Sequence, residues 1–341
     1  MLPNRSLALT TGYAQLRVAI VGDFCLDRYL EIDPSKAETS LETGLPVHNV
    51  ANVRSQPGAA GTILNNLVAL GVGAIYPVGF CGEDGEGYEL VRALQARAGV
   101  RLDHFLQTAE RRTFTYCKPL VVRAGNPPVE LNRLDTKNWT PTPDAVSAKL
   151  AASLNTLADE VDAAILMDQV DLAETGVVTS RVLSQVQQIA ARRPGLPILA
   201  DSRRSLRGFP PVIFKMNGKE LALLTGSTGD AEVDALKPLA ADLARRQGRT
   251  VFVTLAERGM IGATPDGATK HVPALPLRGE IDIVGAGDAV TANLAAALAA
   301  GATVREAMQL AMAAASIVIH QLGTTGTASV PQIQRLLFPT S

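Results

Sequence analysis

The sequence contains little of what marks a secreted or zinc-binding protein. It has only three cysteines and four histidines among 341 residues, and Cys25, Cys81 and Cys117 form no CxxC pair. A zinc site made of thiolates and imidazoles is therefore not expected. We expect the cysteines to be buried apolar side chains in a reducing compartment.

Long apolar runs and an excess of one charge are also missing. No segment approaches the roughly 20 apolar residues that cross a bilayer, and residues 1–16 lack the apolar core of a signal peptide. The formal net charge of -1 provides no basic surface for nucleic acid or for an acidic membrane. We therefore expect a cytoplasmic protein whose partners are small molecules.

The apolar content is high enough for a substantial core, since 47% of the residues are hydrophobic. A chain of this length forms one large domain or two small ones. We expect residues 1–341 to form a single main domain.

Short apolar segments alternate with helical segments along most of the chain. Arg17 to Gly22 is a continuous apolar run of the kind found in central parallel strands. Further strands are expected at 74–79, 163–167, 197–200, 212–216 and 250–255, and helices at 144–159, 177–192, 234–247 and 289–300. This alternation predicts an α/β fold with a doubly wound, mainly parallel sheet and helices on both faces.

Two extended segments interrupt this pattern. Residues 29–56 and 112–134 show strand-like alternation and turn residues where a crossover helix would be expected. They could pair into one small sheet lying over the site, so we predict a lid. A small sheet of this kind would leave an exposed edge, which makes a homodimer through the lid plausible.

Polar side chains follow several of the predicted strands. Asp27 comes shortly after the first strand, Asp168 and Asp201 follow two others, and Asn217 and Glu220 follow a third. Each residue alone is more simply explained as a loop or helix cap. Together they favour a ligand site, because the carboxyl ends of parallel strands meet at one edge of a sheet.

The segment Asp282-Ile-Val-Gly-Ala-Gly-Asp288 runs directly into an alanine-rich helix. Glycines and unpaired N–H groups at a helix start can hold a phosphate, and a carboxylate there can take a proton from a bound hydroxyl. The simpler alternative is a glycine-rich helix entry in which Asp288 is a first-turn charge favoured by the helix dipole.

Other phosphate-binding loops are absent. Gly218-Lys219 is followed by Glu220, so there is no Walker A loop, and the stretch from Gly71 has Tyr76 where a dinucleotide fingerprint needs its third glycine. The failed fingerprint argues against an NAD-dependent oxidoreductase.

Five blocks of sequence resemble the PfkB (ribokinase-like) carbohydrate kinases. From the N-terminus they are Gly58 to Asn66, Val78 to Gly85, Asn217 to Glu220, Thr254 to Gly259 and Asp282 to Asp288. The blocks follow one another in the same order as in that family. The resemblance runs from about Arg17 to Ile333. It implies a ribokinase-like fold and ATP-dependent transfer of phosphate to a sugar or sugar phosphate.

The resemblance also implies roles for individual residues. Asp288 would be the general base, and the backbone N–H groups of Gly285, Ala286 and Gly287 would stabilise the transferring phosphoryl group. The residues that would face the sugar are Asp27, Gly58, Ala59, Asn65 and Asn66.

The nucleotide side is implied in the same way. Asn217 and Glu220 would hold Mg²⁺ through water, and Asp282 would help to bind a monovalent cation such as K⁺. Thr254, Gly259 and Gly323 would border ATP.

Within this family, the stretches Gly22 to Tyr29, Ser40 to Val47 and Gln321 to Thr325 are most similar to the heptose-7-phosphate kinases. That subgroup has a second glycine at Ala59, an asparagine at Thr62 and a lysine-glycine pair at Val170-Asp171. These departures leave open a nucleoside kinase on the same fold, or a sugar- or nucleotide-binding protein without catalysis.

Overall fold

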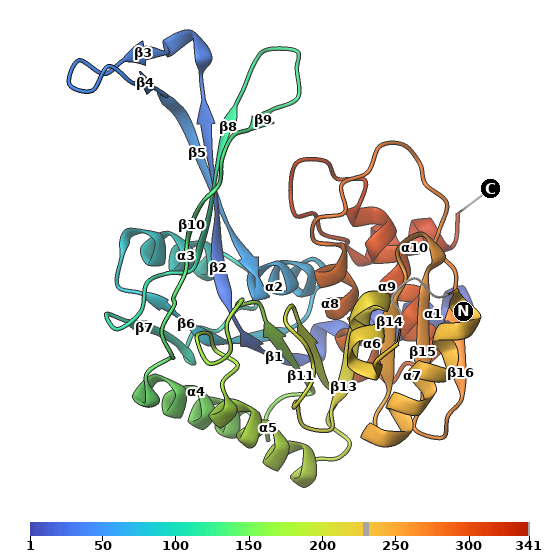
Figure 1. Cartoon of the computed structure of the whole chain (residues 1–341). Helices are drawn as coiled ribbons and strands as arrows, with labels where there is room; N and C mark the ends of the chain where they lie inside the picture. The colour runs from blue at the N-terminus through green and yellow to red at the C-terminus, as the bar shows by residue number, and fades with distance from the viewer. Residues whose placement is uncertain (228–231, 340–341) are drawn as a thin grey trace.

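The computed structural model describes residues 1–227 and 232–339, and its centre is a nine-stranded sheet (Figure 1). The strand order is β16-β15-β14-β13-β12-β11-β1-β6-β7, parallel from β14 to β7 and antiparallel at β15 and β16. The strands are β1 (Arg17–Gly22), β6 (Ala74–Gly82), β7 (Phe105–Thr108), β11 (Ala163–Asp168), β12 (Ile198–Ser202), β13 (Ile213–Asn217), β14 (Val251–Thr254), β15 (Met260–Ala263) and β16 (Thr269–Val272).

Helices cover both faces of this sheet and bury two separate apolar clusters. One face carries α4 (Asp144–Leu157), α5 (Ser180–Arg192), α6 (Gly218–Thr225) and α7 (Val233–Gln247). The other carries α1 (Pro3–Thr11), α2 (Ala60–Ala69), α3 (Gly85–Gln95), α8 (Ala286–Ala299), α9 (Val304–Val318) and α10 (Val330–Leu337). Short 3-10 turns lie at Gly12–Gln15, Pro34–Lys36 and Ala256–Arg258. The predicted doubly wound α/β fold is confirmed.

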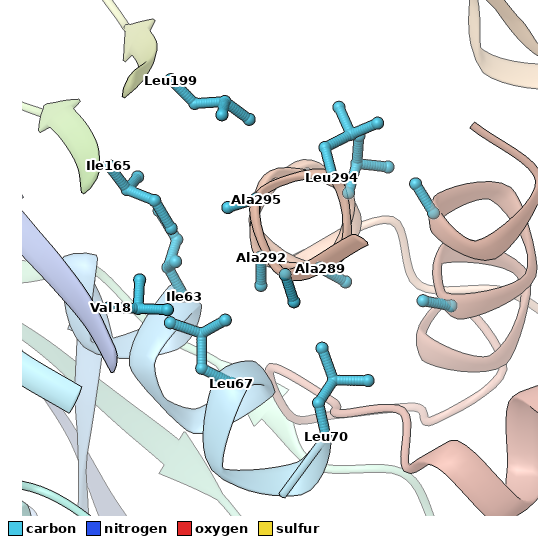
Figure 2. Packing of buried hydrophobic residues seen from close by; sticks show 14 of the residues in the cluster. Val18, Ile63, Leu67, Leu70, Ile165, Leu199, Ala289, Ala292, Leu294 and Ala295 are labelled. Atoms are coloured by element: carbon cyan, nitrogen blue, oxygen red, sulfur yellow. The ribbon is translucent and has the colours of Figure 1, made fainter. Parts of the chain in front are cut away.

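Helix α8 is buried along almost its whole length. Alanines such as Ala289, Ala292 and Ala295 let it lie close to α2, whose Ile63 and Leu67 face it (Figure 2). Close packing of this kind leaves little room for displacement. The N-terminus of α8 is therefore held in a defined position relative to the sheet.

A second sheet projects from the main body (Figure 1). Its order is β10-β8-β2-β5, with β9 paired to β8, and a two-stranded hairpin of β3 and β4 lies near its tip. The strands are β2 (Phe24–Ile32), β3 (Glu38–Thr39), β4 (Pro46–Val47), β5 (Val50–Ala59), β8 (Thr115–Val121), β9 (Val129–Glu130) and β10 (Leu134–Thr136).

This small sheet begins and ends at different residues from the predicted insertions at 29–56 and 112–134. Only Asp23 separates β1 from β2, so the chain passes from the main sheet into the lid without a loop. Strand β5 then leads directly into α2, which extends the first insertion to Ala59. The lid is therefore continuous with the elements that bear the site.

Two further findings concern the cysteines and the helices. Cys25 and Cys81 are buried, Cys117 is partly exposed, and all three carry free thiols. Among the helices of residues 1–227 and 232–339, none has the length and apolarity that crossing a membrane requires.

Candidate active site

The candidate site lies at the carboxyl ends of the central strands. The chain adds β6 and β7 on one side of β1, and β11 to β14 on the other, so the topology reverses at β1 and β11. Open α/β sheets bind ligands at such a reversal. The start of α8 and the base of the lid both lie at this edge (Figure 1).

The N-terminus of α8 is left open by its own sequence. Gly285 precedes the helix with a φ of 82°, a conformation that glycine adopts readily, and no side chain caps the helix. Ala286 N–H donates to the carbonyl of Ile283 at 3.2 Å. The next two N–H groups, of Gly287 and Asp288, have no intrahelical acceptor because they belong to the first turn. They can donate hydrogen bonds to an anion bound in the opening.

Asp288 lies in the first turn of α8 and is partly buried. Burial raises the pKa of its carboxyl to about 7, with Asp201 and Asp27 adding to the rise and Lys215 opposing it. The carboxyl therefore titrates far above the ordinary range of an aspartate. A base with a pKa near the working pH is well suited to proton transfer.

Beneath the start of α8, a buried ion pair joins two neighbouring strands. Lys215 Nζ on β13 lies 2.7 Å from Asp201 Oδ2 on β12, and Thr291 of α8 donates to the same oxygen at 3.2 Å. A Cβ on Gly287 would lie 3.1 Å from Lys215 Nζ, so the ammonium group touches the glycine turn. Burial lowers the pKa of Lys215, but Asp201 more than offsets this and the net shift is upward.

Asp27 lies within β2, which corrects the expectation of a loop residue after the first strand. It is 5% exposed, and burial raises the pKa of its carboxyl. A Cβ on Gly58 would lie 2.6 Å from Asp27 Oδ2, so glycine is required at this position of β5. Asp27 and Asp288 interact electrostatically across the opening.

The two asparagines of α2 lie differently from each other. Asn66 is fully buried and donates to the carbonyls of Thr62 at 3.0 Å and Gly326 at 3.5 Å, so it faces the core. Asn65 donates to Pro57 O at 3.3 Å, and its Oδ1 has no partner among the described residues. Asn66 Oδ1 likewise has no partner among the described residues, so the two asparagines differ in the partial exposure of Asn65.

Ala59, at the junction of β5 and α2, has an unusual backbone. Its φ is 53° and its ψ is -118°, a region that residues with a Cβ rarely adopt. Its methyl group packs against Cys25, Phe114 and Tyr116 on the inner side of the lid. The turn keeps the shape that a glycine would give it, at a cost in backbone strain.

Asn217 and Glu220 form a reciprocal capping box at the start of α6. Asn217 Oδ1 accepts from Glu220 N–H at 2.9 Å, and Glu220 Oε2 accepts from Asn217 N–H at 2.7 Å. Both residues offer oxygen atoms that could coordinate a metal through water. Burial raises the pKa of the Glu220 carboxyl, and the negative charge of Asp201 raises it further. Mg²⁺ prefers oxygen donors and keeps several waters, so this pair fits a metal held through water.

The loop before α8 is tied to the loop after α9. Asp282 accepts from Val284 N–H at 3.0 Å and from Gly323 N–H at 3.4 Å. Apolar side chains in these two loops are exposed, namely those of Leu277, Ile281, Ile283, Val284 and Leu322. An apolar rim of this kind suits the face of a planar base.

The other residues expected on the nucleotide side have backbone roles. Thr254 Oγ1 donates to Met216 O at 3.3 Å and so joins β14 to β13. Gly259 has a φ of 89°, and a Cβ there would lie 2.1 Å from Val272 O. Gly259 is therefore needed for the close approach of β15 and β16.

Val170 and Asp171 border a different hollow. Together with Asp23 and Phe114 they line a cavity of about 20 Å³, which has room for one water molecule. Asp171 is paired there with Lys137 at 2.6 Å. A cavity of this volume does not accommodate a sugar.

Comparisons with known proteins show the family and the fold of the chain. The sequence profile of the pfkB family carbohydrate kinases matches residues 17–331. The chain belongs to this family. The family takes its description from carbohydrate kinases.

Among sequence relatives, the bifunctional protein HldE of Azorhizobium caulinodans is 32% identical over 312 residues, which are 90% of this chain and 61% of that protein. The chain thus spans less than two thirds of that relative. The Arabidopsis thaliana ribokinase complexed with ribose and ATP has a TM-score of 0.68 at 20% identity, covering 95% of this chain and 99% of that one. Phosphofructokinase-2 from Escherichia coli in complex with potassium has a TM-score of 0.67 at 18% identity, covering 94% and 98%. These two structures establish the ribokinase-like fold.

One residue at the centre of the site was not found from the sequence. Lys215 lies in the apolar run Val212 to Met216, which forms a buried strand, and lysine is rare at such positions. A lysine in such a run indicates a nearby carboxylate, because a buried cation needs a partner of opposite charge. The sequence pointed to the strand-end Asp201 but did not pair the two.

Proposed function

We propose that the chain transfers the γ-phosphoryl group of ATP to a hydroxyl group of a sugar or sugar phosphate. The hydroxyl oxygen attacks the γ-phosphorus while Asp288 takes the hydroxyl proton. The bond from the γ-phosphorus to the β,γ-bridging oxygen breaks, and ADP leaves with the electron pair. The observation that supports this most strongly is the uncapped start of α8, where open N–H groups stand beside a carboxylate with a pKa of about 7.

In this proposal, the surrounding residues stabilise the phosphoryl group and bind the metal. The N–H groups of Gly287 and Asp288, with the nearby Lys215 ammonium group, offset the charge that develops on the phosphoryl oxygens. Asn217 and Glu220 would hold Mg²⁺ through water. When bound, Mg²⁺ neutralises phosphate charge.

The first test measures ADP release with ATP, Mg²⁺ and a panel of sugars and sugar phosphates. Asp288→Asn removes the base without changing its size, so we expect turnover to fall by a factor of about 10² to 10⁴. The matched control is Asp144→Asn, which changes another first-turn aspartate whose side chain is 96% exposed. Full turnover in Asp288→Asn would disprove the assignment of the base.

For the acceptor, we propose a heptose phosphate. The support comes from the stretches at 22–29, 40–47 and 321–325, which are similar to heptose-7-phosphate kinases, and from sequence relatives named HldE. The test compares kcat/KM for heptose 7-phosphate, other sugar phosphates and adenosine. A clear preference for adenosine would instead support a nucleoside kinase.

A non-catalytic binding protein is a second candidate because Ala59 stands where the heptose-7-phosphate kinases that this chain resembles have a glycine, in a backbone conformation that favours glycine. Shifts in thermal unfolding with sugars or ATP, without release of ADP across the whole panel, would support it. Turnover with any sugar excludes it.

We also propose that Asp282 helps to bind a monovalent cation such as K⁺. Its carboxylate already joins the two loops that border the nucleotide, at Val284 and Gly323. The test replaces KCl by tetramethylammonium chloride at equal ionic strength. Turnover should fall in wild type and should respond less in Asp282→Asn. An equal response in both proteins would reject this role.

A homodimer through the lid is proposed as well. Several apolar side chains are exposed on the lid, among them Leu41, Leu45, Val50, Val53 and Leu134. Exposed apolar surface next to open strand edges favours association. Light scattering that gives the mass of one chain at working concentration would reject the dimer.

A further inference from the structure

The register of the lid sheet places a row of cations next to Asp27. Asp27 on β2 is opposite Tyr116 on β8, which is opposite Asp135 on β10. Two residues further along β2, Tyr29 is opposite Arg54 on β5 and Lys118 on β8. Side chains two residues apart share a face of a sheet, and the rows are about 7 Å apart.

Arg133 completes the second row. It directly precedes β10, in line with Lys118, because the next residue, Leu134, is paired with Cys117. Its guanidinium group lies 4.6 Å from the centre of the Tyr116 ring. The row therefore runs from Arg54 through Tyr29 and Lys118 to Arg133, and it carries three positive charges.

These cations are crowded around aromatic rings. Arg54 and Lys118 lie 4.7 Å and 5.1 Å from the centre of the same Tyr29 ring. Arg54 is paired with Glu31 at 2.5 Å, and Arg133 is paired with Asp135. Lys118 forms no salt bridge with any carboxylate of the described residues. Lys118 is thus the cation of this row whose charge no carboxylate of the described residues offsets, and a bound anion would offset it.

The row belongs to the face that looks onto the site. Asp27 of the first row interacts electrostatically with Asp288, and both Lys118 and Arg133 act on the carboxyl of Asp27. Gln56, which is opposite Asp27, donates to Thr325 Oγ1 at 2.6 Å, close to the start of α8. From the start of α8 outward along the lid, the charged groups therefore lie in the order Asp288, Asp27 and then the cations.

The opposite face of the lid contacts helix α3 of the main body. Arg28 Nη2 donates to Glu89 on α3 at 2.9 Å, and Ser55 donates to the same carboxylate at 2.6 Å. This face therefore rests on the body of the protein, and the Lys118 face is left for a ligand.

We infer that Lys118 and Arg133, with Arg54 beside them, bind a phosphate group carried by the acceptor sugar. This inference rests on the proposed function, because it takes Asp288 as the place where the accepting hydroxyl is held. The acceptor is then a sugar phosphate whose phosphate lies at the end remote from the reacting hydroxyl. Its product is a bisphosphate with the two phosphates at opposite ends.

The test compares sugars with and without the phosphate in the intact protein. The probes are heptose 7-phosphate against heptose, and fructose 6-phosphate against fructose. Lys118→Met should raise KM for the phosphorylated sugar about tenfold to a hundredfold, the loss expected for a charge-assisted contact. Its effect on the unphosphorylated partner should be at least about tenfold smaller. Lys118→Arg should restore most of the affinity.

Two further variants keep the test decisive if Lys118→Met folds poorly. Arg133→Gln changes a side chain that is 43% exposed, and it should show the same selective rise in KM. Arg123→Gln, a lid cation in the exposed turn after β8, is the control and should change neither substrate. Equal effects on both members of a pair in Lys118→Met and Arg133→Gln would overturn the inference.

A binding measurement separates this inference from the proposed function. Calorimetry with Asp288→Asn should detect the sugar phosphate, and Asp288→Asn combined with Lys118→Met should bind it about tenfold or more weakly. Lys118-dependent binding without turnover in wild type supports the phosphate site and rejects the kinase mechanism. Turnover that does not depend on Lys118 or Arg133 supports the mechanism and rejects the phosphate site.

Inorganic phosphate should compete with the sugar phosphate, and equal competition against the free sugar would reject the site.

Discussion

Lys215 Nζ lies 2.7 Å from Asp201 Oδ2, in a buried pair directly beneath the helix that carries the catalytic candidate. One cation thus stands between two carboxylates, since Lys215 also acts on Asp288. The two residues lie on adjacent strands, and their side chains are only 9% and 12% exposed. This arrangement leads to the first two predictions.

Lys215→Met should destabilise the fold strongly. It would leave Asp201 buried without a cation, and breaking a buried pair in this way costs about 3–5 kcal/mol. Urea unfolding measures the change. Asp201→Asn combined with Lys215→Met should recover much of the loss, because no buried charge remains. A double variant as unstable as the single one would contradict this explanation.

Activity should depend on pH through Asp288. The base must be ionised, and its pKa is raised to about 7, so kcat/KM should rise with pH through a midpoint near pH 7 and level off about one unit above it. Lys215 opposes that rise, so Lys215→Met should move the midpoint to higher pH. The measurement is kcat/KM between pH 5.5 and 9. A flat profile from pH 6 to 8, or a shift to lower pH, would contradict the assignment.

Asp288→Asn should stabilise the protein at neutral pH while it removes activity. A carboxyl whose folded pKa is raised is favoured in its protonated form, so native stability falls as pH rises from about 4 to above 7. The asparagine has no charge to bury. We expect a gain of about 1–2 kcal/mol at pH 8, below the full value of the pKa shift because the group is partly exposed.

The gain in Asp288→Asn should shrink towards pH 4, where the wild-type carboxyl is protonated. Thermal unfolding at pH 4.5 and pH 8 measures the difference. Asp144→Asn serves as the control and should change stability by less than about 0.5 kcal/mol at either pH. A loss of stability in Asp288→Asn at pH 8 would show that the charge is not strained in the native state.

Ala59→Gly should also stabilise the fold. The backbone at Ala59 has a φ of 53°, and relieving such strain is worth about 1 kcal/mol. The control is Ala152→Gly in the exposed interior of α4, which should cost about 0.5–1 kcal/mol. Chemical unfolding of both variants tests the pair. Destabilisation at both sites would mean that the methyl packing against Phe114 outweighs the strain.

Much of the fold could be predicted because local patterns carry it. The run from Arg17 to Gly22 is apolar and β-branched, and it forms an interior parallel strand. The antiparallel pair β15 and β16 was not predicted, since it is short and its pairing depends on Gly259 allowing two backbones to approach.

The candidate site was predicted less completely. Asn65 and Asn66 are neighbours in sequence, yet only the helix packing sends Asn66 into the core. Lys118 and Arg133 are distant in sequence and carry no motif. Their common face follows from the pairing of β2, β8 and β10, which no short-range pattern specifies.

The sequence by itself determined the doubly wound architecture and the glycine turn that opens α8, because hydrophobic period and glycine conformation are local properties. Tertiary structure alone decided how the charges act. It placed Lys215 against Asp201, raised the pKa of Asp288 to about 7 by burial, and aligned the lid cations beyond Asp27. Those outcomes depend on desolvation and on strand register, which exist only after distant segments have packed together.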